Sequence, residues 1–405
     1  SNFSQAADDF TKMLQQAQTL GSLELQAAAL NSLTMTLFFA HRLDETLKRA
    51  AEALEVAERA GNERLRLDTM VMIGLKHACY GEVEEGKAIL DEVIATARRL
   101  DYKPALLGGV TWRACFHFFQ SEYELAVEKA LEGIRLASEL RDGFLMLTAM
   151  FFLGLSQGNQ GQMSAALATL QEAMEKARRN GDSFWHPRFP NCIGWIYREL
   201  HDFEAARKFD EEGVDIARRH HVLEAEANSL INRGIDCTHA GQRQCTDEAF
   251  EEVKDIFARD AWFRWRYNIR LQAATAVHHL RQHELDRARE YSERLEKTAR
   301  EHGVHKYLAV AHQLMAESLV ESGDLAGAAE RFNAALAELK DYPAPLVAWK
   351  VHAGIARLKS QAGDATSAAE HATRAREIVD SIAANVSDDN LRQNFLTDAH
   401  ASVTS

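Results

Sequence analysis

Apolar and small residues recur along this chain with a period of 40 residues. Within each period the apolar residues fall at helical spacing in two stretches that a short turn separates, and this pattern predicts two antiparallel helices per unit. In most units an apolar residue follows the turn, at Leu43, Val83, Tyr123, Met163, Phe203, Leu285 and Leu325. The pattern therefore predicts an all-α solenoid in which each helix pair packs on the next.

Small residues mark where the helices of a unit must approach closely, because a bulky side chain there would push them apart. A first column, shifted by two residues after position 234, comprises Thr34, Gly74, Ala114, Gly154, Gly194, Gly234, Ala276, Ala316 and Ala356. A second column follows twelve residues later, at Thr46, Gly86, Ala126, Ala166, Ala206, Thr246, Ala288, Ala328 and Ala368. A third position, seven residues further on, is small at Ala53, Gly133, Ala173, Gly213, Ala335 and Ala375.

These three columns resemble the tetratricopeptide repeat over nearly the whole chain. The resemblance implies a right-handed superhelix of antiparallel helix pairs with about nine repeats. The units have 40 residues where 34 are common, which adds about one helical turn to each unit. Such long repeats are similar to the sensor regions of bacterial signal-transduction ATPases and of regulators like the maltose-regulon activator. The phosphate-loop pattern GxxxxGK[ST] is absent, so any ATPase would lie outside this sequence.

We expect three parts in the chain. Residues 1–22 are predicted to be the second helix of a truncated preceding repeat, and the initial Ser-Asn suggests a piece of a longer protein. Residues 383–405 are predicted to form a capping helix and tail. The array between them, 23–382, divides into repeats near 23–62, 63–102, 103–142, 143–182, 183–222, 223–263, 264–303, 304–341 and 342–382.

Two irregularities interrupt the array. Pro187 and Pro190 fall where the first helix of the fifth repeat should begin, so this helix should start late or bend, because proline lacks the backbone donor and clashes with the preceding turn. The shift of the small-residue columns predicts extra residues after Gly241, around Gln242–Asp247. An interrupted helix in the middle of the array would provide a hinge or reshape the groove. The alternative is a tolerated variation of the loop.

Charge and composition narrow the class of protein. A net charge of −13 repels polyanions, which argues against nucleic-acid binding. No apolar run approaches the roughly 20 residues of a membrane helix, and no secretory signal is evident, so we expect a cytoplasmic protein without membrane contact.

Candidate chemistry is sparse. Adjacent histidines, as in His220/His221 and His278/His279, diverge on a helix, so we expect them at helix ends or on the surface and not at a metal. No acid, base and nucleophile occur at a spacing that this fold would bring together, so we predict no catalytic site, no cofactor and no enzyme. Reduced, buried thiols are expected for the five scattered cysteines, which show no CxxC spacing: Cys79, Cys115, Cys192, Cys237 and Cys245.

The resemblance places a concave groove along the first helix of each repeat. Counting from the first small residue predicts an apolar half of the groove at Phe38, Phe39, Phe118, Phe119 and Phe151. The same count predicts a polar, basic centre at Arg188, Asn191, Trp195, Arg198, Asn228 and Arg270, and further polar lining at Gln313, Glu317, Lys350 and Arg357. Guanidinium groups offer a planar fork to carboxylate or phosphate, and Asn side chains bond both edges of a peptide unit. Packing between repeats and local ion pairs are the alternative for each of these side chains.

Aromatic and arginine residues also cluster at 262–270, where the first helix of the seventh repeat opens. Such residues form binding hot spots, and guanidinium stacking on indole adds about 0.5 to 2 kcal/mol. Helical spacing sends Trp262 and Trp265 to one side and Arg264 elsewhere, so for part of this cluster we favour packing between repeats over a ligand site.

These features favour a non-catalytic recognition array, the regulatory sensor region of a larger bacterial signalling or transcriptional regulator. The expected partner is a protein or peptide in the concave groove, and a small anionic effector is an alternative ligand. Two further functions stay open: a scaffold that self-associates, and a domain that binds a small-molecule inducer. The sequence leaves the oligomeric state open.

Overall fold

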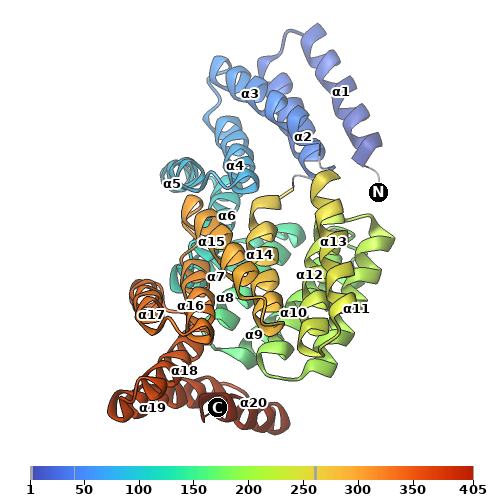
Figure 1. Ribbon diagram of the computed structural model, residues 1–405. Helices are drawn as coiled ribbons and strands as arrows, with labels where there is room; N and C mark the ends of the chain where they lie inside the picture. Colours follow the sequence, from blue (N-terminus) through green and yellow to red (C-terminus); the bar gives the residue numbers. More distant parts are fainter. Residues whose placement is uncertain (1–2, 41, 260–261, 405) are drawn as a thin grey trace. The chain divides into compact units, whose positions relative to one another are not determined.

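The computed structural model describes residues 3–40, 42–259 and 262–404, and every regular element in these ranges is helical. Figure 1 shows the helices following one another as antiparallel pairs. Helix α1 (Phe3–Thr19) precedes nine pairs, and α20 (Asp389–Thr404) follows them. No helix in the described part of the chain is long and apolar enough to cross a membrane. The predicted all-α solenoid of helix pairs is confirmed.

The helices of the first four pairs are long and regular. Their bounds are α2 (Leu23–Phe39) with α3 (Leu43–Arg59), α4 (Glu63–Tyr80) with α5 (Val83–Arg99), α6 (Lys103–Phe119) with α7 (Tyr123–Leu140), and α8 (Gly143–Asn159) with α9 (Met163–Arg179). The other five pairs are α10 (Phe189–Glu199) with α11 (Phe203–His220), α12 (Leu223–His239) with α13 (Arg243–Arg259), α14 (Arg264–Arg281) with α15 (Leu285–Glu301), α16 (His305–Ser322) with α17 (Leu325–Asp341), and α18 (Pro345–Gln361) with α19 (Ala365–Ala383).

The chain forms two compact units. Unit 1 consists of Ser1–Phe116 and Glu128–Ala149, and unit 2 consists of His117–Val127 and Met150–Ser405. Unit 2 contains the first-helix residues that were predicted for the centre of the groove.

Close packing at the small-residue columns explains why the helices pair. A Cβ atom added at Gly154 would lie 2.6 Å from Cγ of Leu170, and one added at Gly74 would lie 2.7 Å from Cδ2 of Leu90. Both distances are far shorter than van der Waals contact, so only glycine lets the leucine of the second helix seat against the backbone of the first. The prediction that these positions set the helix spacing is confirmed.

Local signals fix where many of the helices begin and end. The side chain of Asn62 accepts a hydrogen bond of 3.2 Å from the backbone N–H of Leu65 and so caps α4. Helix α4 ends at Gly81, whose φ of 76° lies in the left-handed region that glycine adopts without strain.

The fifth pair departs from this regularity, as the prolines predicted. A 3-10 turn (His186–Arg188) precedes α10, which has 11 residues where α8 has 17. Pro190 lies in the first turn of α10, where a backbone N–H would have no helical partner, so proline costs little there. The late start of this helix is confirmed.

The predicted insertion after Gly241 is wrong. Helix α13 begins at Arg243, in register with Phe203 of α11 on the 40-residue grid, so the turn between α12 and α13 has the ordinary length. The two-residue shift of the small-residue columns arises later. Helix α13 ends at Arg259 and α14 begins only at Arg264, and α14 has 18 residues where α12 has 17. Residues 260–261 of this connection lie outside the described residues.

Unit 2 closes on itself, because repeats far apart in the sequence touch. Ser164, at the start of α9, donates its backbone N–H to the carbonyl of Asn385 over 3.1 Å. Its hydroxyl oxygen accepts a 2.8 Å hydrogen bond from the backbone N–H of Ser387. Similarly, the backbone N–H of Lys306 donates to the Ser121 hydroxyl over 2.9 Å. These contacts join the early and late repeats of unit 2 around an interior cavity.

Candidate functional site

The cavity has a volume of about 680 Å³, and all of its lining residues belong to unit 2. The first helices of seven successive repeats, from α6 through α18, contribute to its wall. This volume lies in the range of small-molecule and cofactor sites.

The cavity brings together many of the residues predicted for the groove. Of the eleven main candidates, those that line it are Phe118, Phe119, Asn191, Trp195, Arg198, Asn228 and Arg270. The further polar candidates all line it too: Gln313, Glu317, Lys350 and Arg357. Counting along the first helices therefore located one wall of a real cavity in unit 2.

Four candidates lie elsewhere. Phe38 and Phe39 belong to unit 1, where Phe38 is fully buried. Phe151 packs on Trp185, with ring centroids 5.1 Å apart, and is not among the lining residues. Arg188 is also absent from the lining, because it turns to the helix of the next repeat.

Arg188 forms a buried, forked ion pair with Glu224. Its Nη2 donates to one carboxylate oxygen over 2.6 Å and its Nε to the other over 3.3 Å. The Tyr267 hydroxyl also donates to Glu224 over 2.6 Å, and the Arg188 guanidinium lies 3.7 Å from the ring centroid of Phe184. The charge of Arg188 is therefore satisfied inside the protein.

Arg198 bridges two buried carboxylates at the base of the cavity. It donates to Asp236 over 2.6 Å and to Asp210, which is fully buried. Burial raises the pKa of Asp210 to about 7, although the Arg198 charge lowers it, and the nearby Asp236 charge adds to the rise. One guanidinium thus serves two acids, which anchors α10 to α11 and α12.

A chain of amides extends from this ion-pair cluster to the cavity wall. The Asn232 amide donates to Asp210 over 2.7 Å and to the backbone carbonyl of Asn191 over 2.8 Å. The Asn228 amide donates to the Asn191 side chain over 2.5 Å. Arg270 donates to the side-chain oxygens of both Asn228 and Asn232, the latter over 2.6 Å. Arg270 is thereby held in place by neutral groups.

Lys306 is a cavity residue that the sequence analysis missed. Its Nζ donates to Asn159 over 2.7 Å and lies 5.4 Å from the ring centroid of Trp195. Burial lowers the pKa of Lys306, the nearby cations Lys350 and Arg270 lower it further, and Glu199 opposes them.

A second cross-cavity contact joins α10 to α18. Lys350 donates to Glu199 over 3.1 Å, and the Trp195 indole N–H donates to the other oxygen of Glu199 over 3.2 Å. Burial alone would raise the pKa of Glu199, but the positive charges of Lys350 and Lys306 and these hydrogen bonds lower it to about 2.

The aromatic and arginine cluster divides between core and cavity. Trp262 and Tyr267 are buried, and Arg264 is exposed. Trp265 and Arg266 line the cavity, and the guanidinium of Arg266 lies 5.3 Å from the Phe119 ring centroid. Packing between repeats, the favoured interpretation, therefore holds for part of the cluster. Trp265 and Arg266 instead take part in the cavity wall.

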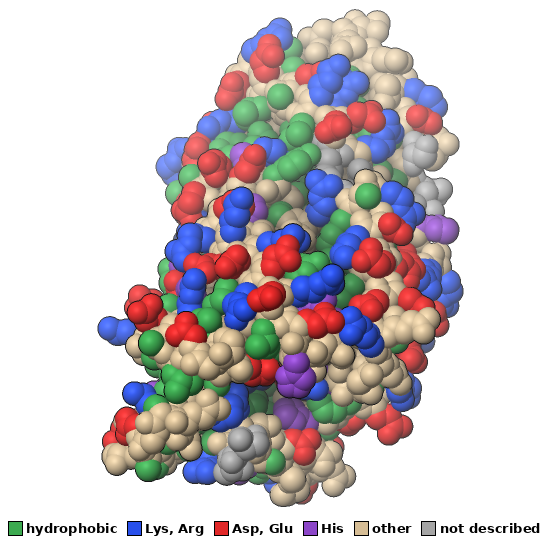
Figure 2. Space-filling model, viewed as in Figure 1, with side chains coloured by type: hydrophobic (Ala, Val, Ile, Leu, Met, Phe, Trp, Pro, Cys, Tyr) green, Lys and Arg blue, Asp and Glu red, His purple; other side chains and the backbone are tan. Residues whose placement is uncertain are grey.

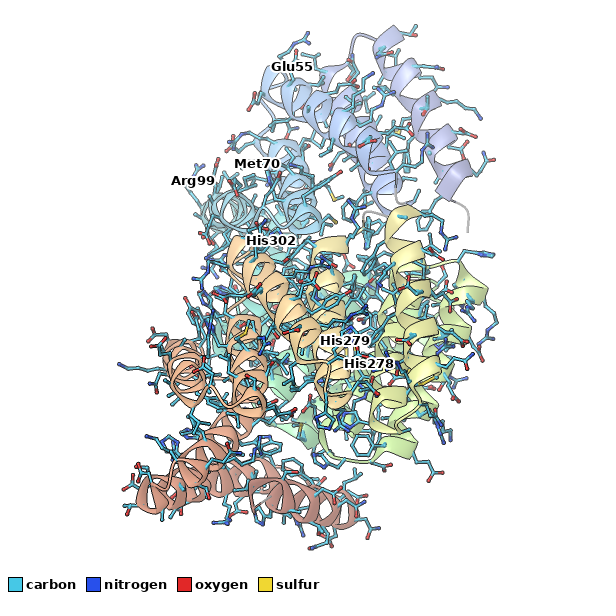
Figure 3. All side chains as sticks on the ribbon, viewed as in Figure 1. Glu55, Met70, Arg99, His278, His279 and His302 are labelled. Atoms are coloured by element: carbon cyan, nitrogen blue, oxygen red, sulfur yellow. A yellow bond between two sulfur atoms is a disulfide. The ribbon has the colours of Figure 1, made fainter. Side chains whose placement is uncertain are left out.

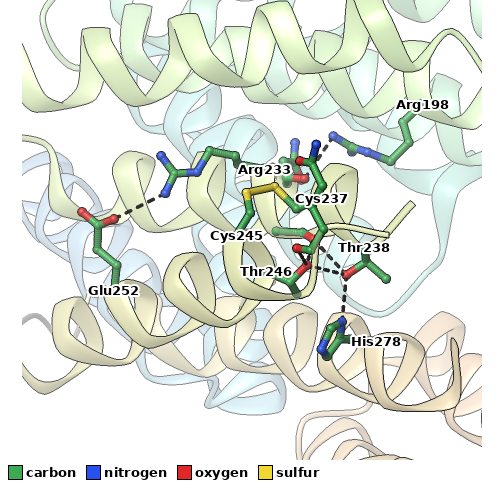
Figure 4. The surroundings of a disulfide bond; sticks show 11 residues. Arg198, Arg233, Cys237, Thr238, Cys245, Thr246, Glu252 and His278 are labelled. Carbon is green, nitrogen blue, oxygen red and sulfur yellow. Dashed lines mark hydrogen bonds and ion pairs between the residues drawn. A yellow bond between two sulfur atoms is a disulfide. The ribbon is translucent and has the colours of Figure 1, made fainter. Parts of the chain in front are cut away.

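The expectation that all cysteines are reduced is wrong for two of them. Cys237 and Cys245 form a disulfide that joins the end of α12 to the start of α13 (Figure 4). Both occupy facing positions beside the turn, with Cα atoms 5.9 Å apart. Cys79, Cys115 and Cys192 are buried and take part in no disulfide, as expected.

The histidine pairs behave differently from each other. His220 and His221 are exposed at the end of α11, as predicted. His278 and His279 lie in the last turn of α14, at a helix end as predicted (Figure 3), and both are buried. His278 lies 3.3 Å from the Thr238 hydroxyl and His279 lies 2.7 Å from a Glu284 carboxylate oxygen, so each buried imidazole has a polar neighbour.

The arrangement offers recognition chemistry. Amide, guanidinium and ammonium donors converge on a space with aromatic and aliphatic walls. Among the described residues, no group of three or more His, Cys, Asp or Glu side chains is arranged to hold a metal ion. Outside the cavity, Figure 2 shows acidic and basic side chains interspersed over the visible face, so the net negative charge is not gathered into one field there.

Comparison with models of known protein families and with curated proteins finds no match. Solved structures do resemble the chain. A Rap protein complexed with competence and sporulation factor has a TM-score of 0.69 at 17% identity, covering 89% of this chain and 99% of that one. The Rap conjugation gene regulator of plasmid pLS20, in complex with the Phr* peptide, has a TM-score of 0.57 at 13% identity and covers 88% and 95%.

A third similar structure is a signal transduction ATPase with numerous domains that carries a tetratricopeptide repeat sensor, from Pyrococcus horikoshii. Its TM-score is 0.51 at 16% identity, and the match covers 87% of this chain and 52% of that one. At such low identities these likenesses concern the fold. The chain is a solenoid of the tetratricopeptide repeat type, like these regulators and sensors.

Proposed function

We propose that the cavity of unit 2 recognises a peptide, either free or as a segment of a partner protein. We further propose that the chain is the non-catalytic sensor region of a larger signalling or transcriptional regulator. The observation that carries the proposal is the cavity itself, because seven successive repeats present their first helices to one space of about 680 Å³. A concave apolar site with a few convergent polar groups is the usual form of a ligand site.

The side chains of the wall suit a peptide. The Asn228 amide uses one of its two N–H groups on Asn191 and can donate the other to a peptide carbonyl. Phe118, Phe119 and Trp265 provide apolar surface for the side chains of a peptide. The Rap regulator of pLS20 is in complex with a peptide, which supports the same ligand class for a chain of similar fold. A shared fold does not fix a ligand, so the cavity of this chain carries the assignment.

The contacts across the cavity supply a route from binding to signal. Lys306 reaches from α16 to Asn159 of α8, and Lys350 reaches from α18 to Glu199 of α10. A ligand that binds between these repeats competes with or reinforces such contacts and so favours one curvature of unit 2. It shifts the equilibrium only by its difference in affinity for the two curvatures.

A small anionic effector is the second candidate ligand. The cavity volume fits a small molecule, and its wall carries more cations than acids: Arg198, Arg266, Arg270, Arg281, Lys306, Lys350 and Arg357 against Glu199, Glu317 and Glu321. A peptide with an acidic group and a small organic anion would use the same donors.

Thermal unfolding with candidate ligands tests the proposal, because a ligand that binds only the folded state raises the unfolding temperature. We would compare a random hexapeptide pool with panels of sugars, nucleotides and amino acids. The parent chain would be tested beside Trp195→Ala and beside Tyr291→Ala, an aromatic control outside the cavity lining.

We expect the peptide pool to stabilise the parent and Tyr291→Ala but not Trp195→Ala. If only small anions stabilise the protein, the ligand of the cavity would be a small anionic effector and not a peptide. Stabilisation that survives in Trp195→Ala, or none from any pool, would contradict recognition at this cavity.

A further inference from the structure

Three half-buried cations in the cavity wall have no counter-charge. Arg266, Arg270 and Lys306 are all half-buried, and no carboxylate of the described residues lies within 4.0 Å of any of them. The other buried cation of the wall, Arg198, has two carboxylates. Half-buried charges are ordinarily paired, because desolvation without a partner costs free energy.

Neutral partners hold each of these cations in position. Arg270 donates to two asparagine side chains, and Lys306 donates to a third, that of Asn159. Arg266 donates to the Tyr267 hydroxyl over 3.2 Å and stacks near aromatic rings. Such partners orient the donors without neutralising them. A guanidinium has five N–H donors, and the described bonds of Arg270 involve only its two Nη atoms, so donors are left for a ligand.

The three cations also act on one another. Arg266 and Arg270 are one helical turn apart on α14, and both lower the pKa of the Cys192 thiol, which burial raises to about 12. Arg270 in turn lowers the pKa of Lys306. The cations are therefore close enough to repel, and an anion between them would relieve that repulsion.

A further donor in the same cavity has no partner. The indole Nε1 of Trp349 is buried and makes no hydrogen bond to any described residue, and Trp349 lines the cavity. A buried indole N–H normally finds an acceptor. A ligand with acceptor oxygens and a negative charge would therefore satisfy both the three cations and this indole N–H.

We infer that Arg266, Arg270 and Lys306 form an oxyanion subsite that receives a carboxylate of the bound ligand. This inference rests on the proposed function and names the chemistry of its ligand. Two guanidinium forks suit the planar, two-oxygen geometry of a carboxylate, and the ammonium adds a point charge from α16, the first helix of the next repeat. Phe118, Phe119 and other apolar side chains of the wall then cover the residue next to the carboxylate.

Peptide pools with and without carboxylates test the subsite. Random hexapeptides would be made with a free C-terminal carboxylate or a C-terminal amide, each with and without Asp and Glu, and benzoate and inorganic phosphate would be titrated alone. The proteins would be the parent, Arg270→Gln, Lys306→Gln, and the control Arg289→Gln, whose side chain lies outside the cavity lining and pairs with Asp286.

We expect every carboxylate-bearing pool to bind the parent and Arg289→Gln at least about tenfold more tightly than the neutral amide pool. This difference should disappear in Arg270→Gln and Lys306→Gln, while the neutral pool binds all four proteins alike. Two pools tell a terminal carboxylate from a side-chain carboxylate. The pool with a free C-terminus but no Asp or Glu offers only the terminal group, and the amide pool with Asp and Glu offers only side-chain groups.

Other outcomes separate the two proposals. Equal binding of charged and neutral pools would overturn the subsite and leave peptide recognition intact. Benzoate binding that requires Arg270 and Lys306, without peptide binding, would support the subsite and overturn the peptide. Preference for phosphate over every carboxylate, or no binding by any probe, would overturn the subsite. Far-UV circular dichroism of both variants would verify that they are folded.

Discussion

Removing the cation at Arg198 should destabilise unit 2 strongly. Arg198 is 7% exposed and is shared by Asp236, 2.6 Å from its Nε, and by Asp210, which is 0% exposed. The change Arg198→Met keeps most of the apolar side chain and leaves both carboxylates without a cation. Breaking a buried ion pair from one side costs about 3–5 kcal/mol, and we expect a loss in this range.

The cost should depend on pH in a defined direction. Burial already raises the pKa of Asp210 to about 7, and loss of Arg198 raises it further. The folded variant then binds protons that the unfolded chain, with carboxyl pKa values near 4, releases. Its stability relative to the parent therefore improves as the pH falls from 8 to 5, because protonation removes the unpaired charge.

Urea denaturation followed by tryptophan fluorescence measures this loss. Five of the six tryptophans lie in unit 2, at Trp185, Trp195, Trp262, Trp265 and Trp349, so the signal reports mainly on this unit. Adding Asp210→Asn and Asp236→Asn to Arg198→Met should recover most of the lost stability. A loss below about 1 kcal/mol, or an equal loss at pH 5 and pH 8, would refute the account of Arg198 as the cation these acids require.

Three more outcomes follow from the packing and charges. Gly154→Leu should lower the free energy of unfolding by about 1–3 kcal/mol through overpacking, while Gly143→Ala, with open space at its Cβ, changes little in the same urea titration. Reductant should lower the urea midpoint by the equivalent of about 2–3 kcal/mol through loss of the disulfide, and should have no effect on Cys237→Ser. The contacts of Glu199 with Lys350, Lys306 and Trp195 together should contribute up to about 3 kcal/mol above pH 4.5, lost as the pH falls towards 2, because they lower the folded pKa of Glu199. Urea midpoints at pH 5 and pH 3 check this, and a pH dependence that is the same in Lys350→Met would contradict it.

The positions of Cys237 and Cys245 relative to the small-residue columns could have predicted their disulfide. Cys237 lies three residues after the small residue Gly234, and Cys245 lies one residue before Thr246 of the second column. In the structure these two positions face each other beside the turn between α12 and α13, with Cα atoms 5.9 Å apart. Searching for a CxxC spacing misses such a pair, because the repeat geometry, and not proximity in sequence, brings the sulfur atoms together.

Only the tertiary structure shows which cations of the cavity wall have no carboxylate partner. Arg188 and Arg198 were predicted ligand residues, but their charges are balanced by Glu224 and Asp236, 36 and 38 residues away in the next repeat. Lys306 was overlooked because it reaches Asn159, 147 residues earlier. Which charged side chains form ion pairs depends on their conformations at the contacts between repeats. A periodic sequence pattern does not determine these conformations.

The sequence alone determined the helix pairs, their period and the late start of α10, because helix formation and close packing depend on local spacing and small residues. Counting from the small residues also placed Asn191, Asn228 and Arg270 at the cavity wall, but it wrongly placed Phe151 and Arg188 there. Tertiary structure decided that unit 2 closes around this cavity, and which cations remain without a carboxylate. These features arise from contacts between distant repeats, whose free energies depend on three-dimensional burial and charge.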